Sequence, residues 1–352
     1  MKTVLRYALV AVIFVPLASL AHHSFAGVFD RGTIIEIEGD LIEVSWRNPH
    51  SHLTIERTDL PGERTTWELE TNGPGILQRA GVERDAFQVG DRVLVAGFGP
   101  VDDVKEMFAT NIMGRNGIEL ILAPAASPEP RWAEERTGDY SYFRREEGDG
   151  SSPELGLFRV WSFTNTSPGL FTEANAQDFE RYPMTEAAQA ALQRFDPATD
   201  NPTLNCVPKG MPTIMEQPLP MEFVGEPDDE IIQLHIEEYD LVRTINMGGE
   251  EAPSSEAASP LGYSVGRWEE ATLVVTTTHL NWPWFSQTGI PQSEDSVLIE
   301  RFSSTEDGSR LNYSMTVTDP VNISEPVTLE NYWLFWPDEE IVQHSASCEE
   351  TG

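Results

Sequence analysis

Histidines near the start of the chain form the first group of residues that could do chemistry. Four of the seven histidines lie close together in sequence, at His22, His23, His50 and His52. If residues 1–21 are removed on export, His22 becomes the N-terminus and offers its α-amine together with a ring nitrogen. His50 and His52 are two residues apart, so a β-strand would place both on one face. An amine with two or three imidazoles suits copper(II), and less selectively zinc. The sequence therefore predicts a metal site of His22, His50 and His52.

A terminal histidine of this kind resembles the histidine brace of copper proteins whose mature chains begin with histidine. The resemblance covers that terminal feature alone, and neither the folds nor the other motifs of those proteins. Metal binding there would displace a proton from the amine, which normally titrates near pH ~8, and would weaken in acid. The alternative is that His22 and His23 only provide a favourable cleavage context and that Asn48-Pro49-His50 is a polar turn.

A second candidate site centres on Arg243, in a stretch with the alternation of a β-strand. The same strand face carries four other residues with large apolar parts: Tyr239, Leu241, Ile245 and Met247. A charge in such surroundings needs a partner, and Glu300 in a later predicted strand is the candidate. Two interpretations stay open, a buried Arg–Glu pair that serves the fold or an arginine that grips an anionic ligand inside a barrel.

Aromatic residues follow a predicted strand at residues 273–280. Trp282 and Trp284 would lie at the mouth of a barrel, where they could line an apolar pocket or cap the barrel end. His279 lies at the end of the same strand, and both faces of that strand could be core. If the barrel interior were the active site of an enzyme, Arg243 and His279 would be its polar groups.

The stretch Gly262-Tyr-Ser-Val-Gly266 matches the nucleophile elbow of serine hydrolases, with Asp319 and His344 following in triad order. The elbow needs a buried strand before it and a helix after it. Here a proline-containing stretch, residues 253–260, comes before, and a β-type run, residues 272–275, comes after. The context therefore argues against a serine hydrolase.

The first 21 residues have the pattern of a secretory signal peptide. Lys2 and Arg6 precede an apolar run at residues 8–17, and Ser19-Leu20-Ala21 supplies small residues before the cleavage point. We expect cleavage after Ala21 and a periplasmic or secreted product. The run is shorter than a bilayer requires and no later segment is long enough, so we expect no membrane span after cleavage. The alternative is that the segment stays as a membrane anchor.

The chain has two cysteines, Cys206 and Cys348. In an oxidising compartment they predict one disulfide, which would close a loop of about 140 residues and hold the C-terminus in place. The alternative, a redox pair or a thiolate metal site, lacks the usual C-x-x-C spacing.

The chain is strongly acidic, with 23 Lys and Arg against 58 Asp and Glu and a net charge of −35. A nucleic-acid partner is excluded on this basis, because phosphate binding requires a basic surface. The same charge argues against docking on anionic lipid. The acidic runs lack calcium-loop spacing, so we interpret most of the charge as solvated surface.

The predicted elements are mainly β and divide the chain in two after the signal segment. Residues 22–123 carry three strands, a short helix at residues 75–81 and further strands, the order of an OB-like five-stranded barrel. Residues 124–154 form a linker with several prolines and glycines. Residues 155–352 carry a helix at residues 185–195 and then strands at near-regular spacing, which predicts an antiparallel meander closed as a lipocalin-like barrel.

Several motifs resemble those of uncharacterised exported bacterial proteins. In the first domain these are His22-His-Ser-Phe-Ala-Gly-Val-Phe-Asp30 and Trp46-Arg-Asn-Pro-His50. In the second they are Cys206-Val-Pro-Lys-Gly-Met-Pro212, Gly262-Tyr-Ser-Val-Gly-Arg-Trp-Glu269 with Thr272-Leu-Val-Val275, and Glu300-Arg-Phe302. The resemblance implies export and a division into an OB-like domain and a β domain of unknown function, and it assigns no catalytic residue.

Together these observations favour an exported binding protein, for a metal ion with copper favoured or for a small ligand. A ligand would be held by the second domain, with Arg243, Glu300, His279, Trp282 and Trp284 as the candidate residues. The alternatives are an enzyme that uses the barrel interior of the second domain, or a protein-interaction module of the cell envelope.

Overall fold

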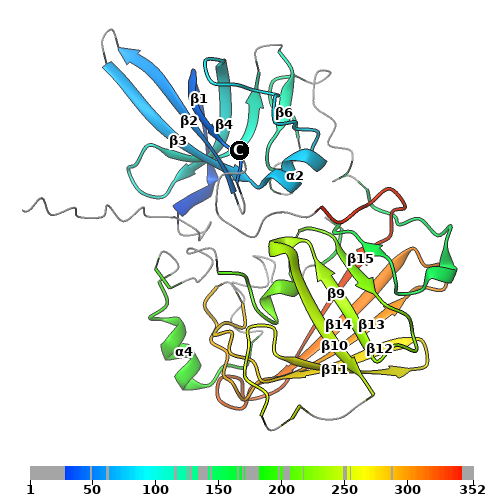
Figure 1. Cartoon of the computed structure of the whole chain (residues 1–352). Helices are drawn as coiled ribbons and strands as arrows, with labels where there is room; N and C mark the ends of the chain where they lie inside the picture. The colour runs from blue at the N-terminus through cyan, green and yellow to red at the C-terminus, as the bar shows by residue number, and fades with distance from the viewer. Residues whose placement is uncertain are drawn as a thin grey trace, which may run out of the picture.

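The computed structural model describes residues 28–342, except residues 48–49, 61–62, 115–116, 125, 127–128, 134–141, 143–144, 165, 169, 171–181, 197–198, 201–206, 217, 249–251, 254 and 287. Within the described residues the chain forms two β units, one above the other in Figure 1. The mainly β fold class that the sequence predicts is confirmed. Helices are short, and none in the described part is long and apolar enough to cross a bilayer.

The first unit is a six-stranded sheet that closes into a barrel, with one helix. Its elements are β1 (Phe29–Ser45), β2 (His50–Leu60), β3 (Glu63–Asn72), α2 (Pro74–Arg79), β4 (Arg92–Pro100), β5 (Glu106–Met113) and β6 (Glu119–Ile121). The strands run in the order β3-β2-β1-β4-β5-β6, and a parallel pairing of β3 with β5 closes the barrel. Three strands, a helix and then β4 and β5 follow the order of the OB barrel, and the short β6 adds a sixth strand beside β5.

The long strand β1 pairs with two neighbouring strands and continues through Gly39 and Asp40. Its first part pairs with β4 and its last part with β2, with a bulge between Leu41 and Glu43. At Gly39 the strands cross so closely that a Cβ atom would lie 2.6 Å from the Glu56 carbonyl oxygen. Glycine is therefore required at this crossing, and the strand bends there instead of ending.

Apolar side chains of alternate strand positions fill the first barrel. The core includes Leu41, Leu53, Ile55, Leu69, Val93, Val95, Met107 and Ile112, all buried. Helix α2 closes one end with Leu77. Gly81 follows the C-cap Ala80 in the left-handed conformation (φ 71°), which glycine adopts readily just past a helix end.

The second unit is a nine-stranded sheet that is nearly closed. Its strands are β7 (Val160–Trp161), β8 (Met221–Val224), β9 (Ile231–Ile236), β10 (Leu241–Met247), β11 (Tyr263–Glu269), β12 (Thr272–Thr278), β13 (Val297–Ser304), β14 (Arg310–Thr318) and β15 (Val327–Leu334). Its helices are η2 (Pro153–Leu155), α4 (Glu186–Leu192), η5 (Thr213–Met215) and η6 (Glu238–Asp240). Strands follow one another in chain order. The edges meet where Ser162 and Leu334 exchange two backbone hydrogen bonds of 2.8 and 3.0 Å.

The second sheet departs from a pure meander at one place. Strands β10 and β11 run parallel, because the connection between Met247 and Tyr263 carries the chain back to the same end. The sequence patterns also missed β8 and β11. β8 has only four residues, and Gly266 interrupts the apolar pattern of β11. The helix predicted at residues 185–195 is found as α4, and Thr185 is its N-cap, with its hydroxyl accepting from Ala188 N at 3.2 Å.

Aromatic rings fill the interior of the second sheet. Four rings form a row across it, in the order Phe223, Phe302, Tyr313 and Trp333. The centroids of neighbouring rings in this row are 4.8 to 5.3 Å apart. Each of the four is at most 3% exposed. The interior is therefore a packed core, which favours a structural role for the polar residues inside it.

A buried arginine joins the two units. Arg79, at the end of α2, donates to both carboxylate oxygens of Glu237 at 2.7 Å and to Glu339 at 3.1 Å. Glu237 Oε2 also accepts from Val342 N at 3.0 Å. The side chains of Arg79 and Glu237 are 10% and 0% exposed. The helix of the first unit is thus tied both to the sheet of the second and to the segment that follows β15.

Candidate functional site

The two histidines of β2 lie on the outer side of the first barrel. Leu53 and Ile55 of the same strand point into the core, so the alternate positions His50 and His52 point away from it. The prediction that these two histidines share one strand face is therefore confirmed. His22 and His23 lie outside the described residues.

A carboxylate from the next strand accompanies the histidines. In the β2–β3 pair His52 stands directly opposite Glu70, and His50 Nδ1 contacts Glu70 Oε1. On the other side His52 stands opposite Ser45 of β1, and Glu70 stands beside Phe108 of β5. We call these five residues, Ser45, His50, His52, Glu70 and Phe108, the histidine face.

The histidine face is sheltered, although it lies outside the barrel. Ser45, Glu70 and Phe108 are 6%, 8% and 5% exposed. The Ser45 hydroxyl has no hydrogen-bond partner among the described residues. The side chain of His50 is 32% exposed, so the face combines one accessible imidazole with buried polar groups beside it.

The start of β1 lies close to the histidine face. The ring of Phe29 is 5.8 Å from that of Phe108, and the ring of Phe108 is 6.2 Å from that of His50. The centroids of Phe29 and His50 are therefore at most about 12 Å apart. His22 precedes Phe29 by seven residues, a length of chain that can span about 24 Å. The predicted mature N-terminus is thus within reach of His50.

A metal ion would need a ligand beyond those that the structure describes. Within residues 28–342, as far as they are described, no group of three or more His, Cys, Asp or Glu side chains is placed to hold a metal ion. The histidine face contributes two imidazoles, and the remaining predicted ligand, His22, lies outside the described residues.

The predicted pair of Arg243 and Glu300 forms inside the second sheet. The Arg243 guanidinium contacts both Glu300 oxygens, with Nη1 2.9 Å from Oε1. It also donates to the hydroxyls of Ser264 at 3.0 Å and Thr277 at 2.7 Å. Tyr313 donates to Glu300 at 2.8 Å. Arg243 and Glu300 are 1% and 0% exposed.

This network is complete in itself. Burial raises the pKa of Tyr313 well above its ordinary value, and the Glu300 charge raises it further. Tyr313 therefore stays a neutral donor, and each Glu300 oxygen has a partner. All three guanidinium nitrogens of Arg243 donate hydrogen bonds within the network. The geometry therefore supports a buried Arg–Glu pair that serves the fold, and not an arginine that binds a ligand.

Ser264 belongs to that network and not to a nucleophile elbow. It lies within β11, pairs with Thr277 of β12 and is 1% exposed. Asp319 is held by Ser293 and Asn322 in a loop, and His344 lies outside the described residues. Burial alone would raise the pKa of Asp319, but these hydrogen bonds hold it below its ordinary value.

The remaining candidate residues lie at one end of the second sheet. His279 has a left-handed backbone (φ 57°), and its Nδ1 is 2.9 Å from the Thr278 hydroxyl. Trp282 is buried and donates to the Thr213 hydroxyl at 3.0 Å. The ring of Trp284 packs edge-on against Phe195 at 4.8 Å. The two tryptophans thus pack against η5 and the residues after α4, as expected of a cap. Cys206 and Cys348 lie outside the described residues, so their disulfide stays a prediction.

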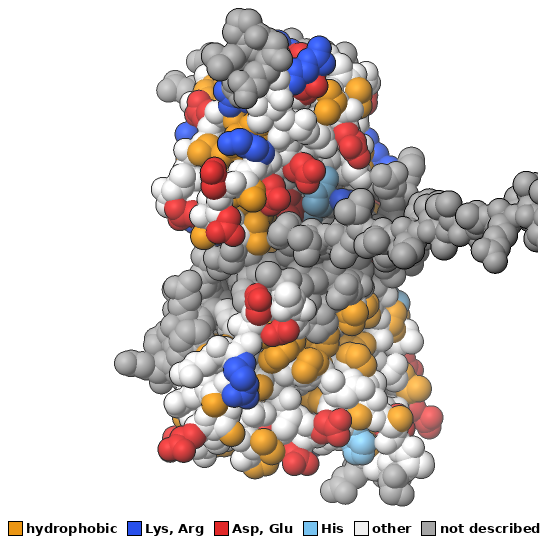
Figure 2. Space-filling model, turned by 90° about the vertical axis from the view of Figure 1, so that its left-hand side faces the viewer, with side chains coloured by type: hydrophobic (Ala, Val, Ile, Leu, Met, Phe, Trp, Pro, Cys, Tyr) orange, Lys and Arg blue, Asp and Glu red, His pale blue; other side chains and the backbone are white. Residues whose placement is uncertain are grey.

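Acidic side chains are scattered over both units on the face drawn in Figure 2. The sequence interpretation of solvated charge agrees with this view. One acid that the sequence patterns missed is Glu70. Its signal was the alternation around Leu69, which puts Glu70 on the outer side, but placing it opposite His52 required the register of the hairpin.

Residues 10–106 match the model of a family of unknown function, DUF6152. The match is consistent with the resemblance to an uncharacterised family, and it includes the histidine positions 22, 50 and 52 and Glu70. No curated protein matches the chain.

Proposed function

We propose that this protein is exported and binds a metal ion, copper(II) in preference to zinc, through His22, His50 and His52. The observation that carries the proposal is the histidine face, where two imidazoles share one side of β2 within reach of the predicted mature N-terminus. An α-amine and imidazoles are nitrogen donors of the kind that copper(II) favours.

Glu70 has a supporting role in this proposal. A carboxylate that accepts from one ring nitrogen of a histidine fixes the ring orientation and makes the other nitrogen a better ligand. The contact of Glu70 Oε1 with His50 Nδ1 would leave Nε2 as the coordinating atom. His52, opposite the same carboxylate, lies beside it on the strand.

The environment of the site favours a cation. The whole chain carries a net charge of −35, and a field of this sign raises the local concentration of cations at the surface. Of the face residues, Glu70 and Phe108 are buried, which limits competition by water for the ligands.

The test is copper titration of the mature protein, purified from the periplasm and followed by electron paramagnetic resonance. We expect one tight site with hyperfine coupling to several nitrogens. Adding a methionine before His22 moves the amine away from the ring and should abolish the tight site. The matched control is His235→Gln, which removes a histidine of β9 that contacts Gln233. A protein that binds copper equally well with the added methionine would overturn the proposal.

A further inference from the structure

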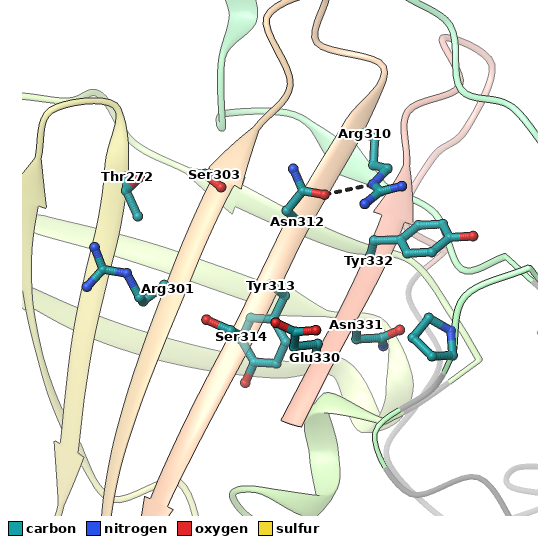
Figure 3. Close-up of a pocket in the computed structure, with 11 residues that line it drawn as sticks. Thr272, Arg301, Ser303, Arg310, Asn312, Tyr313, Ser314, Glu330, Asn331 and Tyr332 are labelled. Atoms are coloured by element: carbon teal, nitrogen blue, oxygen red, sulfur yellow. Dashed lines mark hydrogen bonds between the residues drawn. The ribbon is translucent and has the colours of Figure 1, made fainter. Parts of the chain in front are cut away.

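A hollow lies on the outer side of the second sheet, across β12, β13, β14 and β15 (Figure 3). Its volume is 520 Å³, within the range of small-molecule sites. Pro168, from the segment after β7, borders it. The hollow belongs to the other unit from the histidine face and shares no residue with it.

The floor of the hollow consists of two rows of polar side chains. One row runs from Arg301 through Ser314 to Glu330, and the other from Ser303 through Asn312 to Tyr332, each across β13, β14 and β15. Residues at the alternate positions of these strands, such as Phe302 and Leu311, point into the packed core. The floor is therefore held by the strands beneath it and is preorganised for a ligand.

The chemistry of the floor fits a ligand with many hydroxyl groups. Serine hydroxyls, an amide and a carboxylate offer both donors and acceptors, and a saccharide ring presents donors and acceptors in the same way. Tyr332 supplies an aromatic ring, fixed by its hydroxyl, which donates to Thr166 at 2.8 Å. An apolar ligand would leave these groups without partners.

Arg310 adds a positive charge that the described residues do not neutralise. Its Nε donates to Asn312 Oδ1 at 2.7 Å, and its guanidinium lies 4.2 Å from the centre of the Tyr332 ring. By contrast, Arg301 is paired with Glu269 at 2.6 Å. In a chain with 58 acids and 23 bases, an arginine held by an amide and an aromatic ring is available to an anionic group of a ligand.

We propose that this hollow binds a saccharide that carries a carboxylate, with Arg310 pairing with the carboxylate. Ser303, Ser314 and Glu330 bind the sugar hydroxyls. A guanidinium and a carboxylate form two parallel hydrogen bonds, which gives the pair its strength and its orientation.

The test is nuclear magnetic resonance titration of the full mature protein with D-glucuronate, D-glucose and acetate at millimolar concentrations. We expect glucuronate to shift the amide signals of β13, β14 and β15, with weaker shifts from glucose and none from acetate. If acetate caused shifts as large as those from glucuronate, the hollow would hold any small anion. If glucose bound as tightly as glucuronate, Arg310 would not contribute to recognition of the carboxylate. Either result overturns the proposal, as does the absence of shifts with all three probes.

The variant that tests the charge is Arg310→Gln, which keeps the length and polarity of the side chain. We expect glucuronate binding to weaken at least about tenfold and glucose binding to stay unchanged. The matched control is Arg267→Gln, an exposed arginine of β11 that is paired with Glu269 outside the hollow. Unchanged amide spectra of both variants without ligand show that the sheet is intact. A loss of glucuronate binding that is equal in the two variants would contradict the role of Arg310.

Discussion

The Nδ1 atom of His50 contacts the carboxylate of Glu70 across the β2–β3 pair of the first barrel. The same carboxylate stands directly opposite His52. One buried acid therefore contacts one imidazole and lies opposite the residue that carries the other, on the outer side of the barrel.

Removing this carboxylate should weaken metal binding without unfolding the barrel. For Glu70→Gln we expect the copper affinity to fall about 10- to 100-fold, because His50 loses the group that orients its ring. Isothermal titration calorimetry with copper(II) measures the change. The matched control is Glu68→Gln, an exposed acid two residues earlier on the same strand. Equal affinities for Glu70→Gln and wild type would exclude the supporting role of Glu70.

The buried pair of Arg243 and Glu300 should stabilise the second sheet only as a pair. For Glu300→Gln we expect the free energy of unfolding to fall by roughly 3–5 kcal/mol, because a buried guanidinium is left without its counter-charge. The double variant Arg243→Met with Glu300→Leu should be clearly more stable than Glu300→Gln. Urea unfolding followed by tryptophan fluorescence measures both. If Glu300→Gln were as stable as wild type, Arg243 would have another anionic partner, and the ligand interpretation would return.

The junction of the two units should depend on Arg79. For Arg79→Gln we expect the two units to separate more readily, since Glu237 and Glu339 are left buried without a cation between them. Limited proteolysis should then cut within residues 124–154 faster than in wild type. The matched control is Arg92→Gln, an arginine paired with Glu38 at an exposed position, which should change the rate little. An unchanged cleavage rate in Arg79→Gln would show that other contacts hold the units.

The acid sensitivity of the second unit should depend in part on Asp319. Folding lowers the pKa of this carboxyl group, because hydrogen bonds from Ser293 and Asn322 outweigh its burial. Such a group stabilises the fold above its unfolded pKa, ~3.9, and the stabilisation is lost as the pH falls through the lower, folded value.

We therefore expect Asp319→Asn to be less stable than wild type at neutral pH and to lose less stability below about pH 4. Urea unfolding over a pH series measures the difference. Glu325→Gln, at an exposed position of the same loop, is the control. Parallel pH profiles for Asp319→Asn and wild type would contradict the prediction.

Alternation along single strands accounts for what the sequence predicted well. It placed His50 with His52 on one face, and it placed Arg243 among apolar residues with Glu300 as its partner. Both results need only the two-residue period of a strand. The predicted OB order likewise needed only the order of strands and helix.

Register accounts for what the sequence did not predict. Leu60 pairs with Glu63 at the tip of the β2–β3 hairpin, and continuing that register would put Thr71 opposite His52. A bulge between Thr58 and Leu60 shifts the pairing by one residue and brings Glu70 there instead. The polar hollow required the registers of three strands at once, which no local pattern contains.

Export, the mature N-terminus and copper binding are tested together by the intact mass of the exported protein, recorded under native conditions with and without copper(II). We expect a chain that begins at His22 and gains the mass of one copper ion per molecule. A mature chain that begins at another residue, or a chain from His22 that gains no copper, would contradict it.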